Sequence, residues 1–203
     1  MNNWILPETQ KEIDAFRQGE LVKKKKLKDG YLLNADLSPN YLILDAALWD
    51  IEMDTAFSLG NKYTSLFATR GAEHGLDSVA PYLFEYIEND ELSKWIKEKE
   101  RNGLRTLCIS SEMSLEQLRK HLRRFLRMKK EDGTYIYFRF YDPFVANTVF
   151  PNLSQEQTVQ FFEKIDYLIA DDIRINERHI FYLSSDKILQ IKHQSIDHVD
   201  NNR

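Results

Sequence analysis

A nearly unbroken apolar run at residues 41–47 (YLILDAA) constrains the fold of this chain more than any other segment. A strand with one face in water alternates apolar and polar side chains, whereas a strand buried on both faces is apolar throughout. The run therefore predicts a central strand with both faces covered. Asp45 interrupts it, and we interpret this carboxylate either as one paired near the carboxyl end of the strand or as a site residue.

The spacing of apolar residues and turn residues predicts further elements along the chain. The expected strands are residues 62–68, 82–87, 104–110 and 134–142, with a closing hairpin at 179–183 and 187–192. The expected helices are residues 91–102, 114–126 and 154–168, and one that starts at Asp142 and Pro143. Strands that alternate with helices predict an α/β fold, with a mixed or largely parallel sheet covered by helices and a small C-terminal helix and hairpin.

Three segments are expected from this order of elements. Residues 1–40 form an N-terminal helix and basic connector, residues 41–170 an α/β domain, and residues 171–203 a C-terminal hairpin and polar tail.

The composition limits the environment and the partners of the protein. The chain has 203 residues, a formal net charge of -4 and one cysteine, Cys108. A single cysteine forms neither an intramolecular disulfide nor a multi-thiolate metal site, which is typical of a reducing compartment. No stretch approaches the roughly 20 apolar residues of a membrane span. We therefore expect a cytoplasmic protein without a membrane partner, and the acidic charge argues against nucleic acid as a partner of the whole molecule.

The sequence lacks the familiar catalytic and nucleotide-binding motifs, such as GxGxxG, GxxxxGK[ST], GxSxG and HExxH. Its five histidines include no pair at i, i+4 spacing, so we expect no metal and no cofactor. Asp142 is the best catalytic candidate, and a phosphoester hydrolase built on Asp45 and Asp142 is a distant third hypothesis. A helix N-cap before Pro143 explains Asp142 more simply, so no enzyme activity is expected.

Residues 119–130 carry seven of the 28 Lys and Arg residues and no acidic residue. The strand expected after them places Tyr135, Tyr137 and Tyr141 on one side. Aromatic rows on a sheet stack bases in RNA-recognition domains, so a single-stranded nucleic-acid-binding module is the alternative function. A solvated basic face, or one whose arginines pair with neighbouring acids, explains the same pattern.

The expected helix at residues 114–126 is amphipathic. Ser114 and Gln117 have the spacing of a capping box, and Ser154 and Gln157 have the same spacing at the start of the helix expected at residues 154–168. One apolar face contains Leu115, Leu118, Leu122, Phe125 and Leu126. The arginines of the segment, Arg123, Arg124 and Arg127, are expected to point mainly away from that face. Arg124 is the expected exception, buried against Asp142 or a neighbouring acid.

Six segments, in this order and spacing, resemble one known family. They are YLILDAA at 41–47, SLF at 65–67, APYL at 80–83, SLEQLRKHLRRFL at 114–126, DG at 132–133 and FRFYDP at 138–143. The chain resembles the Tap/TEC family of bacterial type VI secretion adaptor-chaperones over about residues 41–168. The helix followed by FRFYDP is the most specific part of the resemblance. Phe144 departs from the family pattern, which typically has an arginine there.

The resemblance implies a non-catalytic cytoplasmic adaptor that binds a toxic effector and loads it onto the VgrG spike. It also implies an N-terminal α/β lobe, and only residues 169–203 remain for the helical C-terminal lobe that many members carry, so we expect no full helical lobe. The residues expected to contact partners are Arg123, Arg124, Arg127, Arg139 and Tyr141. The residues expected to have structural roles in the motifs are Asp45, His121, Asp142 and Pro143.

Overall fold

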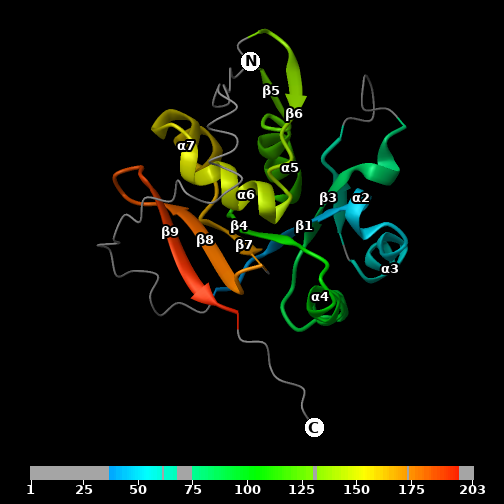
Figure 1. The fold of residues 1–203 in the computed structure, drawn as a ribbon. Helices are drawn as coiled ribbons and strands as arrows, with labels where there is room; N and C mark the ends of the chain where they lie inside the picture. The colour runs from blue at the N-terminus through cyan, green and yellow to red at the C-terminus, as the bar shows by residue number, and fades with distance from the viewer. Residues whose placement is uncertain (1–36, 61, 68–74, 130–131, 173, 197–203) are drawn as a thin grey trace.

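The structure is a computed structural model that describes residues 37–60, 62–67, 75–129, 132–172 and 174–196 (Figure 1). The expected N-terminal helix, the basic connector and the polar tail lie outside the described residues. The strands are β1 (Tyr41–Asp45), β2 (Tyr63–Ser65), β3 (Pro81–Glu85), β4 (Leu107–Ser110), β5 (Arg127–Lys129), β6 (Tyr135–Tyr137), β7 (Tyr167–Asp172), β8 (Glu177–Leu183) and β9 (Leu189–Ser195). The helices are α2 (Ala46–Trp49), α3 (Glu52–Leu59), α4 (Glu91–Arg101), α5 (Leu115–Arg123), α6 (Pro143–Val149) and α7 (Gln155–Phe162), with short 3-10 helices η2 (Asp77–Val79) and η3 (Phe150–Asn152).

Seven strands form one sheet in the order β2-β3-β1-β4-β7-β8-β9. Every neighbouring pair in this sheet is antiparallel, so the expected mixed or largely parallel sheet is wrong. β3 and β4 both run antiparallel to β1 and hence in the same direction, and α4 joins them. Such a crossover normally links parallel neighbours, but here β1 lies between the two strands and pairs with both. The alternation of strands and helices therefore suggested a parallel pairing that does not form.

β1 is buried on both faces, as its composition predicted. Tyr41 and Ile43 belong to the core on one face of the sheet, and Leu42 and Leu44 belong to the core on the other. The first core is covered by α5, α6, α7 and the β5-β6 hairpin, and the second by α2, α3 and α4 (Figure 1). The mixed α/β architecture with helices on both faces of the sheet is therefore confirmed.

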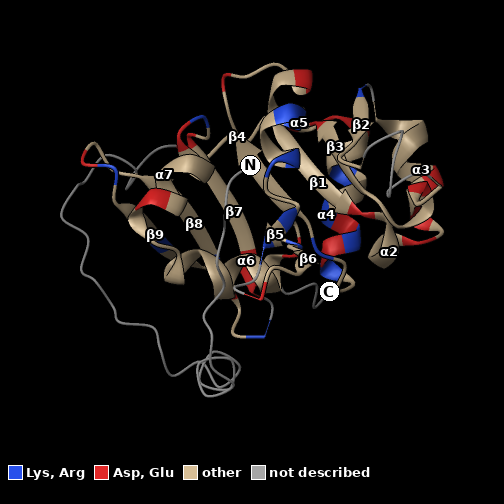
Figure 2. Ribbon diagram, turned by 90° about the horizontal axis from the view of Figure 1, so that it is seen from above, with Lys and Arg blue, Asp and Glu red and all other residues tan. Residues whose placement is uncertain are grey.

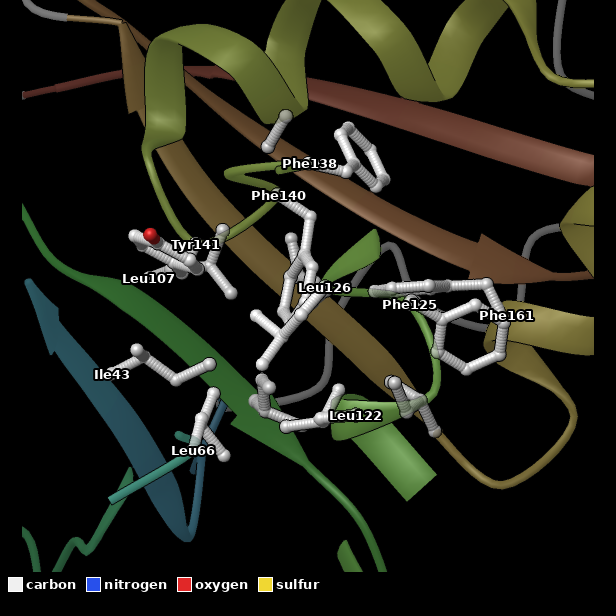
Figure 3. Packing of buried hydrophobic residues seen from close by; sticks show 14 of the residues in the cluster. Ile43, Leu66, Leu107, Leu122, Phe125, Leu126, Phe138, Phe140, Tyr141 and Phe161 are labelled. Atoms are coloured by element: carbon white, nitrogen blue, oxygen red, sulfur yellow. The ribbon is translucent and has the colours of Figure 1, made fainter. Parts of the chain in front are cut away.

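The first core is rich in aromatic rings, and α5 contributes the predicted apolar face to it (Figure 3). Leu118, Leu122, Phe125 and Leu126 are buried, and Leu115 packs against them half-buried. The helix itself ends at Arg123, two residues before Phe125, which is shorter than expected. Phe125 and Leu126 reach the core from the turn that follows. The Phe125 ring packs against the ring of Phe161, with a centroid separation of 5.0 Å.

The strand expected at residues 134–142 is wrong beyond Tyr137. β6 ends there, and the chain then turns into the first core. Phe138, Phe140 and Tyr141 are all buried, with exposed fractions of 4%, 0% and 5%. A regular strand places neighbouring residues on opposite faces, whereas Phe140 and Tyr141 both belong to the first core, so the backbone there is not a regular strand.

The helix expected at residues 154–168 begins at the predicted capping box but ends at Phe162. The apolar residues after it form β7, which pairs with β4 through Leu168 and its neighbours. Apolar positions that fit a helical period also fit a fully buried strand, because such a strand has no polar face to reveal its period. β8 and β9 form the C-terminal hairpin and extend the same sheet beyond β7.

Candidate functional site

An exposed surface with basic and aromatic side chains lies on the β5-β6 hairpin beside the end of α5. The hairpin pairs Arg127 with Tyr137 and Lys129 with Tyr135. Met128, between the two basic residues, is buried in the first core, so period-two alternation turns its neighbours outward. Tyr135 and Tyr137 keep exposed fractions of 50% and 44%.

The Arg127 guanidinium lies 4.9 Å from the centroid of the Tyr135 ring, a cation–π contact. Arg124 is exposed just before the hairpin. We call Arg124, Arg127, Lys129, Tyr135 and Tyr137 the basic–aromatic surface. Figure 2 shows Lys and Arg along α5 and β5 on this side of the molecule. The contact holds a charged and an aromatic side chain together on the exposed side of the hairpin.

Only part of the basic segment contributes to this surface. The Arg119 side chain turns inward, where Nε donates to the carbonyl oxygen of Ser65 at 2.7 Å and Nη2 donates to that of Phe67 at 3.3 Å. Arg119 therefore ties α5 to the end of β2. Arg123 is half-buried. Arg124 is exposed, with its guanidinium 5.8 Å from the Phe125 ring centroid, so its expected burial against Asp142 is wrong.

The other two residues expected to contact partners, Arg139 and Tyr141, lie apart from the hairpin at the carboxyl end of β1. Arg139 forms an ion pair with Asp45, and its guanidinium lies 5.8 Å from the centroid of the Tyr141 ring. Asp45 is 3% exposed, and its Oδ1 also accepts the backbone N–H of Ala47 at 3.1 Å, which caps α2. Burial raises the pKa of Asp45, and the hydrogen bond from Arg139 opposes that shift. Burial also raises the pKa of the Tyr141 hydroxyl.

Asp142 begins α6 beside this ion pair, as its position before Pro143 predicted. Its Oδ1 accepts the backbone N–H of Phe144 at 2.9 Å, and Pro143 occupies the first turn. The Arg105 guanidinium lies 3.9 Å from the same oxygen. Sequence reasoning missed Arg105, because nothing in the sequence links the residues before β4 to the start of α6. Asp45 and Asp142, the two carboxylates of the hydrolase hypothesis, thus each cap a helix and each lie close to an arginine.

His121 has a structural position between α5 and α7. It is 6% exposed, and its Nε2 lies 2.7 Å from the carbonyl oxygen of Phe161. Burial lowers the pKa of the imidazole, which favours the neutral ring. A neutral ring with its proton on Nε2 donates to that carbonyl and joins the two helices.

Phe144, where the resemblance would place an arginine, contacts an arginine from another segment. The Arg174 guanidinium lies 4.1 Å from the Phe144 ring centroid and is also paired with Asp172. This contact connects α6 to the loop between β7 and β8, which the sequence did not predict.

The fold and its exposed hairpin define an α/β domain that presents a basic–aromatic surface beside a helix. The chain belongs to the family described as domain of unknown function (DUF4123), whose model matches residues 40–160. This family is known as the Tap/TEC-type type VI secretion effector adaptor domain. Neither the curated proteins nor the solved structures contain a significant match to the chain. Every helix in the described ranges is too short or too polar to cross a membrane.

Proposed function

We propose that this protein is a non-catalytic cytoplasmic adaptor-chaperone of type VI secretion, which binds a cognate toxic effector and loads it onto the VgrG spike. Membership of the adaptor domain family over residues 40–160 is the observation that carries this proposal. The basic–aromatic surface is the part of the described chain that we assign to partner binding.

The chemistry of that surface supports a protein partner. Tyr and Arg are enriched at protein interfaces because they add large contact areas and directional polar groups. The protein has a net charge of -4, so a local basic surface is suited to an acidic patch on a partner. The nucleic-acid alternative relied on a row of three exposed tyrosines. Tyr141 is buried, so this row is reduced to Tyr135 and Tyr137.

The test reverses two charges on the basic–aromatic surface. Arg124→Glu with Arg127→Glu should weaken capture of the effector or of VgrG at least tenfold in pull-down titrations. Both side chains are exposed, so the melting temperature should change little. Raising the salt concentration should weaken capture by the unmodified protein, since exposed charges are screened.

The matched control is Lys94→Glu with Arg101→Glu on α4. Both residues are exposed, and α4 covers the opposite face of the sheet. This control should capture both partners normally. Normal capture by the Arg124/Arg127 variant would show that the surface is only solvated. If the unmodified protein captures neither partner and a deletion strain still secretes its effectors, the adaptor function is wrong. Loss of RNA binding in the Arg124/Arg127 variant would favour the nucleic-acid alternative.

A further inference from the structure

The C-terminal hairpin brings together two histidines and a glutamate that are separated in the sequence. β8 and β9 pair with His179 directly opposite His193. Glu177 lies two residues before His179 and therefore on the same face of β8. One side-chain ligand atom from each of the three residues lies within 4.8 Å of the other two. The histidine spacing in the sequence gave no indication of this cluster, because strand register rather than a helical repeat creates it.

The two distances to the carboxylate suit a metal ion. Glu177 Oε2 lies 3.3 Å from His179 Nε2 and 3.0 Å from His193 Nδ1. In tetrahedral zinc sites, bonds of about 2.0–2.1 Å place neighbouring ligand atoms roughly 3.3 Å apart. Two of the three distances between ligand atoms are thus close to those of a tetrahedral site, and the third, between the two imidazole nitrogens, is within 4.8 Å.

A neighbouring helix fixes the more buried of the two rings. Asn147 on α6 lies against His179, with 2.9 Å between Asn147 Oδ1 and His179 Nδ1. When that oxygen accepts the Nδ1 proton, Nε2 is left with a lone pair directed toward Glu177.

We propose that Glu177, His179 and His193 form a binding site for a divalent transition metal of the zinc class. Two imidazole nitrogens and one carboxylate oxygen are ligands that such ions prefer. The His193 side chain is 46% exposed and that of Glu177 is 42% exposed, so a fourth coordination position is open to water or to a partner's side chain. The site lies beyond residues 40–160, so it is separate from the region that defines the family.

A metal-free arrangement of the same residues is the competing explanation. The Asn147 Nδ2 atom is buried without a hydrogen-bond partner among the described residues. If the amide is turned over, Nδ2 donates to His179 Nδ1 and the ring proton moves to Nε2, which then donates to Glu177. The two arrangements differ in the His179 nitrogen that carries the proton, and this difference is measurable.

The first experiment titrates the full chain with Zn²⁺ alone by calorimetry and by competition with a chromophoric chelator. We expect one ion per chain and a higher melting temperature in its presence. Glu177→Gln and His193→Gln change exposed side chains, so both should fold, and each should weaken binding at least tenfold. Glu163→Gln, at an exposed position just after α7, is the control outside the cluster and should bind normally. Unchanged affinity in both cluster variants would overturn the proposal.

The second experiment observes the unmodified protein and does not depend on variants. Nitrogen NMR of the histidine rings should show the His179 proton on Nδ1 and no proton on Nε2 when Zn²⁺ is present. Replacement of Zn²⁺ by Co²⁺ should give the visible absorption of a tetrahedral site. A proton that stays on Nε2 at saturating Zn²⁺ would show that the cluster is a hydrogen-bond network only.

Discussion

Asp45 is the most buried carboxylate among the described residues, with an exposed fraction of 3%. It ends the central strand, caps α2 and pairs with Arg139, whose side chain is 42% exposed. A buried carboxylate needs such partners because loss of its hydration destabilises the ionised form. The pair joins the segment after β6 to the centre of the sheet, which gives Asp45 and Arg139 a role in the fold that is separate from the basic–aromatic surface.

Arg139→Gln should lower the free energy of unfolding by about 1–3 kcal/mol, because Asp45 then keeps its charge without the guanidinium. Asp45→Asn should also destabilise the protein. The double variant should lose less than the sum of the two single losses, because removing both charges leaves neither unpaired. Urea unfolding of the four proteins measures this coupling, and additive losses would contradict it.

Glu100 predicts a pH-dependent contribution to stability. Burial raises its pKa from 4.5 to about 6, although a hydrogen bond from Thr106 opposes the shift. Between pH 4.5 and about pH 6, Glu100 holds a proton in the folded state that it has lost in the unfolded state. The contribution of Glu100 to the free energy of unfolding therefore falls as the pH rises through this range and stays low above about pH 6.

Glu100→Gln should therefore stabilise the protein at pH 7 by about 1–2 kcal/mol relative to the unmodified chain. The difference should shrink as pH falls through 6 and vanish near 4.5. Glu98→Gln, which removes a carboxylate from an exposed position of the same helix, is the control variant. Chemical unfolding across this pH range is the measurement, and a pH-independent difference would assign the effect to packing.

At the scale of elements, helix starts are the features that side chains specify most directly. α5 and α7 both begin with a complete capping box, in which Ser114 or Ser154 exchanges hydrogen bonds with a glutamine three residues later. α6 begins with Asp142 as the cap and Pro143 in the first turn. These contacts are local, so each one fixes where its helix starts whatever the rest of the chain does.

Asp142→Ala should destabilise the protein by about 1 kcal/mol, because the backbone N–H of Phe144 loses its acceptor. Asp142→Asn should cost much less, since an amide oxygen caps almost as well. Thermal and urea unfolding of both variants separate the effect of the lost helix cap from the effect of the lost negative charge near Arg105. If a folded Asp142→Asn protein loses all biological function, the carboxylate has a chemical role and the hydrolase hypothesis returns.

At the scale of the whole molecule, a seven-stranded sheet separates two apolar cores. The first core is the larger and contains the aromatic rings that α5, η3 and α7 surround. The Phe161 ring lies 4.8 Å from that of Phe150 and 5.3 Å from that of Phe140, measured between centroids. Such a core is close-packed, so a cavity within it is not easily refilled.

Leu122→Ala should therefore destabilise the whole protein by about 2–5 kcal/mol, because Leu122 is completely buried in this core. Leu122→Met nearly preserves the volume and should cost less than about 1.5 kcal/mol. Leu48→Ala, at a side chain that is 38% exposed, is the control and should change stability little. The free energy of urea unfolding is the measurement, and equal losses for Leu122→Ala and Leu48→Ala would show that α5 does not anchor the core.

The sequence by itself determined the features that depend on near neighbours. The apolar run of β1 predicted a doubly buried strand, and the capping boxes predicted where α5 and α7 start. The period-two alternation that begins at residue 134 predicted that Tyr135 and Tyr137 lie on the same side of β6. Strand pairing was decided only by the tertiary structure, because β1 lies between β3 and β4 and no local pattern specifies that position. The same holds for the partners of Asp45 and Asp142 and for the Glu177, His179 and His193 cluster. Those contacts join residues far apart in the chain, and the packing of the whole molecule selects them.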